Sequence, residues 1–143
     1  MDKHDILKSI DSCANNPPRI VDITVHKHIE YANNLIITEA SFKDDDLSFI
    51  GYSIRYEYPD LISGDEEVFH EYVNCIQPHE VGFPEFRKVF KSSILDKAIA
   101  HRVDLSEIEC VVDLLKPDND SYDMWFFLKG RNKKYCIFYD YCD

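Results

Sequence analysis

Residues 83–101, FPEFRKVFKSSILDKAIAH, contain the change of hydrophobic period on which the fold prediction rests. Apolar side chains recur there every three or four residues, as one face of an α-helix requires. They are Phe86, Val89, Phe90, Ile94 and Ala98. Pro84 falls near the first turn, where the backbone N–H that proline lacks has no helical partner. The stretch therefore predicts a helix from Pro84 to about His101.

The chain before this helix alternates apolar and polar residues with the period of two that is typical of β-strands. Three strands joined by short polar turns are expected, at residues 19–31, 35–42 and 50–58. The region from Arg19 to Glu57 is therefore predicted to form an antiparallel meander. Residues 68–76 fit a fourth strand, and a helix there stays open.

Two further helices are expected on either side of these elements. Residues 2–14 have the apolar spacing of a short amphipathic helix. Asp104 and Glu107 have the spacing of a capping box, which predicts that a helix begins there and runs to Leu115.

The chain is expected to end in a hairpin formed by Met124–Leu128 and Lys134–Tyr141. Strands that are separated from helices along the chain favour an α+β fold. The prediction is a single domain over residues 1–143, in which helices pack on one face of an antiparallel sheet made of the meander and the C-terminal hairpin.

The composition is strongly acidic, with 27 Asp and Glu residues, 16 Lys and Arg residues and a net charge of −11. Such a field repels nucleic acid and anionic membranes, because proteins bind both through basic side chains. It attracts basic surfaces, and most basic surfaces in a cell belong to proteins that act on nucleic acid. The expected partner is therefore a basic protein. Binding to nucleic acid or to a membrane is not expected.

The N-terminal sequence MDKHDILKSIDSC interrupts its apolar runs with Asp2, Asp5 and Asp11, which is unlike a secretory signal. No apolar run approaches the length of a membrane span. The five cysteines are odd in number and lack CxxC spacing, which favours free thiols in a reducing compartment. The expected location is the cytoplasm.

His26, His28 and Glu30 alternate along one expected strand and therefore share one of its faces. Such a row offers zinc ligands, but no further ligand is evident that would complete a tetrahedral site. No P-loop, GxGxxG or GxSxG pattern occurs, and no cysteine has a catalytic signature. We expect no metal, no other cofactor and no enzymatic activity. A small enzyme that uses His26, His28 or His70 stays open as an alternative.

Acidic residues gather in three stretches that the pattern assigns to loops. They are Asp44, Asp45 and Asp46; Asp65, Glu66 and Glu67; and Asp118, Asp120 and Asp123. Tyr58 lies close to the second stretch in sequence, and tyrosine beside carboxylates adds contact area to a protein interface. We expect these residues to bind the protein partner.

An acidic, α+β domain of this size with those three acidic stretches, and without catalytic or export signals, resembles the immunity proteins that bacteria make against secreted nuclease toxins. These include the immunity proteins of contact-dependent growth inhibition systems. The resemblance implies a cytoplasmic protein that neutralises a cognate toxin domain, a basic nuclease, by binding over or beside its active site. Secretion chaperones of the type III class are also small, acidic and α+β, but they usually end in a helix. The oligomeric state is left open.

Overall fold

The computed structural model describes the chain except residues 21, 31–32, 59–65, 90–92, 116–122 and 142–143. Its α-helices are α1 (Lys3–Asn15), α2 (Asp46–Tyr52), α3 (Glu66–Asn74), α4 (Phe83–Val89) and α5 (Ser93–Arg102). Its strands are β1 (Thr24–Glu30), β2 (Asn33–Ser41), β3 (Ile76–Val81), β4 (Ile108–Leu115), β5 (Met124–Gly130) and β6 (Lys133–Tyr141). A π-helical segment, η1 (Ser53–Glu57), continues α2, and a 3-10 helix, η3 (Leu105–Glu107), precedes β4.

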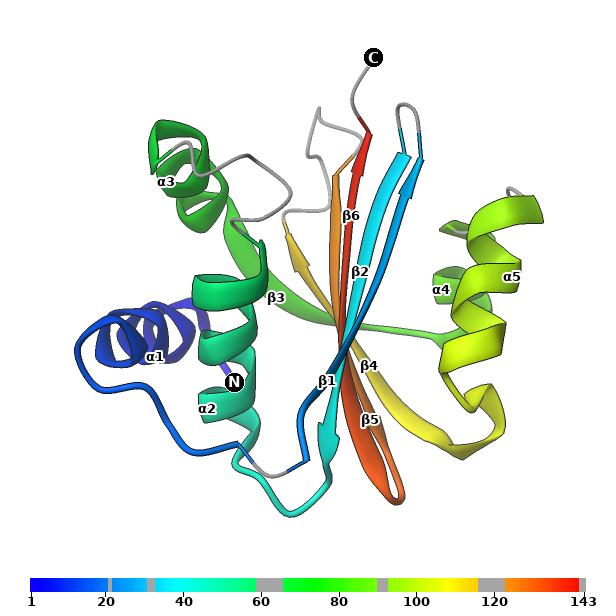
Figure 1. Ribbon diagram of the computed structural model, residues 1–143, viewed down its shortest axis with the longest axis horizontal. Helices are drawn as coiled ribbons and strands as arrows, with labels where there is room; N and C mark the ends of the chain where they lie inside the picture. The colour runs from blue at the N-terminus through cyan, green and yellow to red at the C-terminus, as the bar shows by residue number, and fades with distance from the viewer. Residues whose placement is uncertain (21, 31–32, 59–65, 90–92, 116–122, 142–143) are drawn as a thin grey trace.

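The strands form one antiparallel sheet in the order β1-β2-β6-β5-β4-β3 (Figure 1). The hairpin of β5 and β6 occupies its centre, and residues 125–128 and 134–140 are buried. Strands covered on both faces need apolar residues at consecutive positions, which these two strands largely supply. The predicted C-terminal hairpin, the antiparallel sheet and the α+β class are confirmed.

Helices cover both faces of the sheet (Figure 1), where the sequence pattern predicts helices on one. The first core lies under α1, α2 and α3 and includes Ile6, Ile50 and Trp125. The second lies under α4 and α5 and includes Phe86 and Phe126. Consecutive residues of β5 thus enter opposite cores. A sheet whose central strands are apolar on both faces requires a cover on each face, which explains the second helical layer.

Residues 50–58 are helical, so the third strand predicted there is wrong. The buried side chains in this segment include Ile50, Ile54 and Tyr58, which are four residues apart. A spacing of four fits both the period of two and one turn of a helix, so this alternation did not distinguish them. The meander predicted for residues 19–57 is therefore reduced to β1 and β2, and β6 lies beside β2 in place of a third strand.

Helices α1 and α2 approach closely because α2 contains a glycine at their contact. A Cβ atom on Gly51 would lie 2.2 Å from Ser9 Oγ and 2.9 Å from the Ser9 carbonyl carbon. Ser9 Oγ donates a hydrogen bond to the carbonyl oxygen of Leu47 at 2.6 Å. Gly51 is thus fixed by the packing of two helices against each other.

Residues 108–115 form strand β4, so the helix predicted after Asp104 is wrong. Asp104 does accept a hydrogen bond from Ser106 N at 3.1 Å, but it caps only the short turn η3. Strand β4 contributes Val111 to the second core and Val112 to the first. A strand that is buried on both faces does not alternate apolar and polar residues. Its apolar residues can then have the same spacing as one face of an amphipathic helix.

Three other sequence predictions are settled by the helices. The helix predicted at residues 2–14 is confirmed as α1. The helical alternative at residues 68–76 is borne out by α3, after which β3 begins at Ile76. The stretch predicted as a single helix from Pro84 to His101 contains two helices, α4 and α5.

Candidate functional site

The first acidic stretch, residues 44–46, lies at the start of α2 and has a structural role. Asp45 is the N-cap of α2, and its carboxylate accepts hydrogen bonds from Ser48 N at 2.9 Å and from Ser48 Oγ at 3.0 Å. Such a cap satisfies backbone N–H groups that have no partner inside the helix.

Replacing Asp45 by alanine is expected to lower the free energy of unfolding by about 1 kcal/mol, because the first turn of α2 loses its cap. Chemical denaturation measures the loss. Glu109→Ala, which removes an exposed carboxylate in a strand, is the control and should change stability by less than about 0.5 kcal/mol. Equal losses in the two variants would contradict the capping role.

Asp46 connects the same helix to the central hairpin. Its carboxylate forms ion pairs with Lys129, at 3.0 Å, and with Lys134, whose side chain is only 3% exposed. Lys134 also donates a hydrogen bond to the carbonyl oxygen of Asp44. Burial raises the pKa of Asp46, but the hydrogen bonds and charges of the two lysines outweigh burial and hold this pKa below its ordinary value. The stretch therefore stabilises the fold and is largely engaged within it.

Two predicted contact residues are inside the protein. Tyr58 is fully buried, and its ring packs edge-on against Trp125 with 4.4 Å between the ring centroids. Asp123 is buried as well, at 6% exposure. Neither residue is placed to meet a partner at the surface, which corrects the prediction for both. Asp65, Asp118 and Asp120 lie outside the described residues.

Glu66 and Glu67 are exposed in the first turn of α3, as a partner-binding role requires. Three more exposed acids, which the sequence analysis did not select, lie on the same helical layer: Asp2, Asp11 and Glu71. The N-terminus of α1 and the C-terminus of α3 are linked by a 2.7 Å hydrogen bond from Lys3 Nζ to the carbonyl oxygen of Asn74. We call these five acids the acidic helical face.

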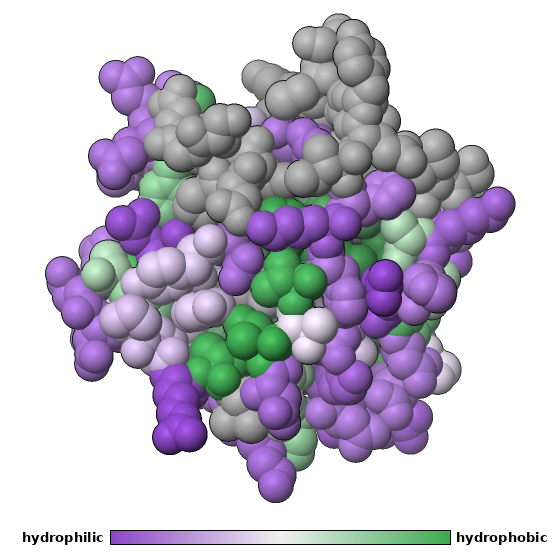
Figure 2. Space-filling model, viewed as in Figure 1, coloured by the Kyte–Doolittle hydropathy of each residue, from purple (hydrophilic) through white to green (hydrophobic). Residues whose placement is uncertain are grey.

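The two helical layers differ in charge. The acidic helical face lies on the layer of α1, α2 and α3. On the opposite layer, α4 and α5 carry more basic than acidic residues. The basic ones are Arg87, Lys88, Lys97 and Arg102, and the acidic ones are Glu85 and Asp96. In Figure 2, hydrophilic side chains cover most of the coloured part of the visible face, and apolar ones appear in small patches near its middle.

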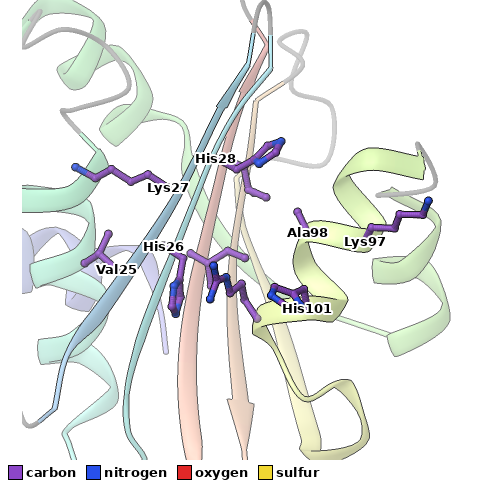
Figure 3. Close-up of a pocket in the computed structure, with 10 residues that line it drawn as sticks. Val25, His26, Lys27, His28, Lys97, Ala98 and His101 are labelled. Atoms are coloured by element: carbon purple, nitrogen blue, oxygen red, sulfur yellow. The ribbon is translucent and has the colours of Figure 1, made fainter.

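His26 and His28 share one face of β1, as their spacing predicts, and Figure 3 shows His28 extending toward the side of α5 while the ring of His26 lies alongside the strands. His26 Nε2 is 3.7 Å from a carboxylate oxygen of Glu39 on the neighbouring strand. Among the described residues, no group of three or more His, Cys, Asp or Glu side chains is arranged to hold a metal ion. The cysteines of that part of the chain, Cys13, Cys75, Cys110 and Cys136, are free thiols.

Comparisons with protein-family models, with curated proteins and with solved structures find no match to this chain. Within the described ranges, every helix is too short or too polar to cross a bilayer. The acidic helical face has the same sign of charge as the protein as a whole, whose net charge is −11.

Proposed function

We propose that this protein is an immunity protein, which binds a basic toxin domain in the cytoplasm through the acidic helical face and neutralises it. The observation that carries the proposal is the distribution of charge. The net charge is −11, and exposed carboxylates gather on α1 and α3, while the partly buried Asp46 and Glu39 pair with lysines of the β5–β6 hairpin. The toxin is proposed to be a nuclease, because a nuclease presents a basic surface to its own substrate.

In this proposal the acidic helical face attracts the basic toxin domain over a distance and then contacts it directly. Opposite charges on two proteins raise the association rate by about 10- to 1,000-fold at low salt. Short-range packing then sets the dissociation rate. Tyr56 is half-exposed on the same layer and is held by a hydrogen bond from its hydroxyl to the carbonyl oxygen of Cys13, at 2.5 Å. An aromatic ring anchored in this way suits the interior of an interface.

Neutralisation is tested with the product of the gene directly upstream of the gene for this chain, where that gene encodes a large secreted protein. Its C-terminal domain is expressed in cells with and without this protein, and growth is followed. The proposal expects growth arrest that co-expression relieves. Binding to a secreted protein that does not arrest growth would instead favour a secretion chaperone, and a toxic domain whose effect is unchanged by co-expression would refute the immunity function.

Reversing charge on α3 is expected to slow association without unfolding the protein. In Glu66→Lys/Glu67→Lys the steering field at the proposed contact changes sign, so the association rate at low salt should fall by about tenfold or more. Surface plasmon resonance with the toxin domain, repeated over a range of salt concentrations, measures this rate.

A matched control separates the local effect from the effect of net charge. Glu85→Lys/Glu109→Lys changes the net charge by the same amount, at exposed positions away from α1 and α3. Glu85 also lies in the first turn of a helix, so the change in the helix dipole interaction is similar at that residue. The control should alter the association rate by less than about threefold. Equal slowing in both variants would place the contact elsewhere.

A further inference from the structure

A cavity of about 710 Å³ lies between β1, β2 and α5, on the opposite side of the sheet from the acidic helical face (Figure 3). Pockets for small molecules typically measure roughly 300–1,000 Å³. Apolar side chains of β2 and α5 contribute to the lining: Leu35 and Ile37, which are at most 2% exposed, and Ala98. The cavity therefore has the size and the apolar floor of a small-molecule site.

The ionisable side chains that line this cavity are basic. In Figure 3, His28 extends from β1 toward the side of α5, the ring of His26 lies alongside the strands, and His101 lies on α5; all three line the cavity. Arg102, the last residue of α5, also lines the cavity. Within the described part of the chain, the lining includes no Asp or Glu. Such a concentration of basic groups is unexpected in a protein with a net charge of −11.

Two of these basic side chains, those of His101 and Arg102, lie in the last turn of α5. His101 and Arg102 form no ion pair with the residues that the structure describes. His26 Nε2 lies 3.7 Å from a carboxylate oxygen of Glu39, and the same carboxylate pairs with Lys133 Nζ at 2.5 Å. His101 and Arg102 are exposed, so a ligand in the cavity can reach both side chains.

The edge of the sheet adds hydrogen-bonding groups. Strand β1 has one neighbour in the sheet, β2, and four consecutive residues of β1, 25–28, line the cavity. Side chains alternate between the faces of a strand, and Lys27 extends away from His26 and His28 (Figure 3), so consecutive lining residues indicate that the backbone edge borders the cavity. Outward-facing N–H and C=O groups on such an edge are open to a ligand.

We propose that this cavity binds a phosphate monoester that carries an aromatic body. The terminal oxygens of the phosphate accept hydrogen bonds from His101, Arg102 and the histidines of β1, and the aromatic body lies on the floor formed by β2. A phosphate monoester offers three acceptor oxygens and close to two negative charges, whereas a carboxylate offers two oxygens and one charge. Three imidazoles and a guanidinium therefore match a phosphate better than a carboxylate. The inference does not depend on the proposed immunity function.

The test is a titration of the protein with phenyl phosphate and with adenosine 5′-monophosphate, followed by NMR of the histidine rings. At low salt and about pH 6.5, each ester should shift the ring signals of His26, His28 and His101 in a saturable way. The expected dissociation constant is below about 1 mM. Inorganic phosphate, which lacks the aromatic body, and benzoate, which lacks the phosphate, should each bind at least tenfold more weakly than phenyl phosphate.

Matched variants locate the site. His101→Ala/Arg102→Ala removes two exposed basic side chains of the cavity and should weaken binding of phenyl phosphate by tenfold or more. His70→Ala/Arg131→Ala removes the same two residue types from exposed positions on α3 and on the β5–β6 turn, and should leave binding within about twofold of wild type.

Three outcomes would overturn the proposal. The first is that neither ester shifts the three histidine rings at concentrations up to about 10 mM. The second is that benzoate binds as tightly as phenyl phosphate, which would mean that phosphate is not the recognised group. The third is that the two double variants weaken binding equally, which would mean that the esters respond to overall charge and not to this cavity.

Discussion

Replacing Trp125 by alanine is expected to lower the free energy of unfolding by about 3–5 kcal/mol. Trp125 is fully buried, and the distance between ring centroids is 4.4 Å to Tyr58 and 5.6 Å to Phe138. Tyr58 comes from the end of the α2–η1 segment and Phe138 from β6, so the indole joins the helical layer to the centre of the sheet. Removing it leaves a cavity that the surrounding core fills only in part.

Urea denaturation measures this loss, and Phe83→Ala provides the control. Phe83 is also aromatic but is 38% exposed, so its removal should lower the free energy of unfolding by less than about 1 kcal/mol. If Trp125→Ala cost no more than Phe83→Ala, the ring cluster at Trp125 would not be the centre of the first core.

The C-terminal hairpin was predictable because its sequence determines its structure locally. Residues 124–128 and 134–141 are rich in aromatic residues and are separated by a short turn at Gly130. No competing helical pattern exists there. The amphipathic helix α1 was predictable for a similar reason, since the N-cap Asp2 and the stripe that begins at Ile6 agree with each other.

Residues 50–58 and 108–115 were not predictable from period alone, for two different physical reasons. In the first segment the buried residues are four apart, a spacing that a helix and a strand share. In the second, both faces of the strand are buried, so the alternation that identifies a half-exposed strand is absent. One segment predicted as a strand is helical, and one predicted as a helix is a strand, so the α+β class is unchanged.

The sequence predicts that the candidate site is acidic, but it does not predict which acidic residues are accessible to a partner. Acidic stretches are visible in the sequence, whereas the partner of each carboxylate depends on the fold. Asp46 pairs with Lys129, which is 83 positions away, and Glu39 pairs with Lys133, which is 94 positions away. An acidic residue in such an ion pair stabilises the fold and is less accessible to a partner. Glu66 and Glu67 are exposed because of where α3 packs on the sheet. The spacing of apolar residues in the sequence does not predict that position.

Replacing Asp46 by alanine is expected to lower the free energy of unfolding by about 3 kcal/mol, because Lys134 then stays buried without its carboxylate partner. Lys134→Met should lower it by only about 1 kcal/mol, since Asp46 is partly exposed and keeps Lys129 as a partner. The double variant should be closer in stability to Lys134→Met than to Asp46→Ala. A double-mutant cycle measures the coupling, and additive losses would contradict a direct pair.

Acid pH gives an independent test of the same ion pair. Burial raises the pKa of Asp46, but Lys134 and Lys129 outweigh it, so this pKa is lower in the folded than in the unfolded chain. A carboxyl group of this kind stabilises the fold above its unfolded pKa, and its contribution is lost as the pH falls through its folded pKa. The difference in unfolding free energy between wild type and Asp46→Ala should therefore be constant above about pH 5 and shrink below about pH 4. A difference that persisted unchanged down to about pH 2 would mean that the charge of Asp46 does not stabilise the fold.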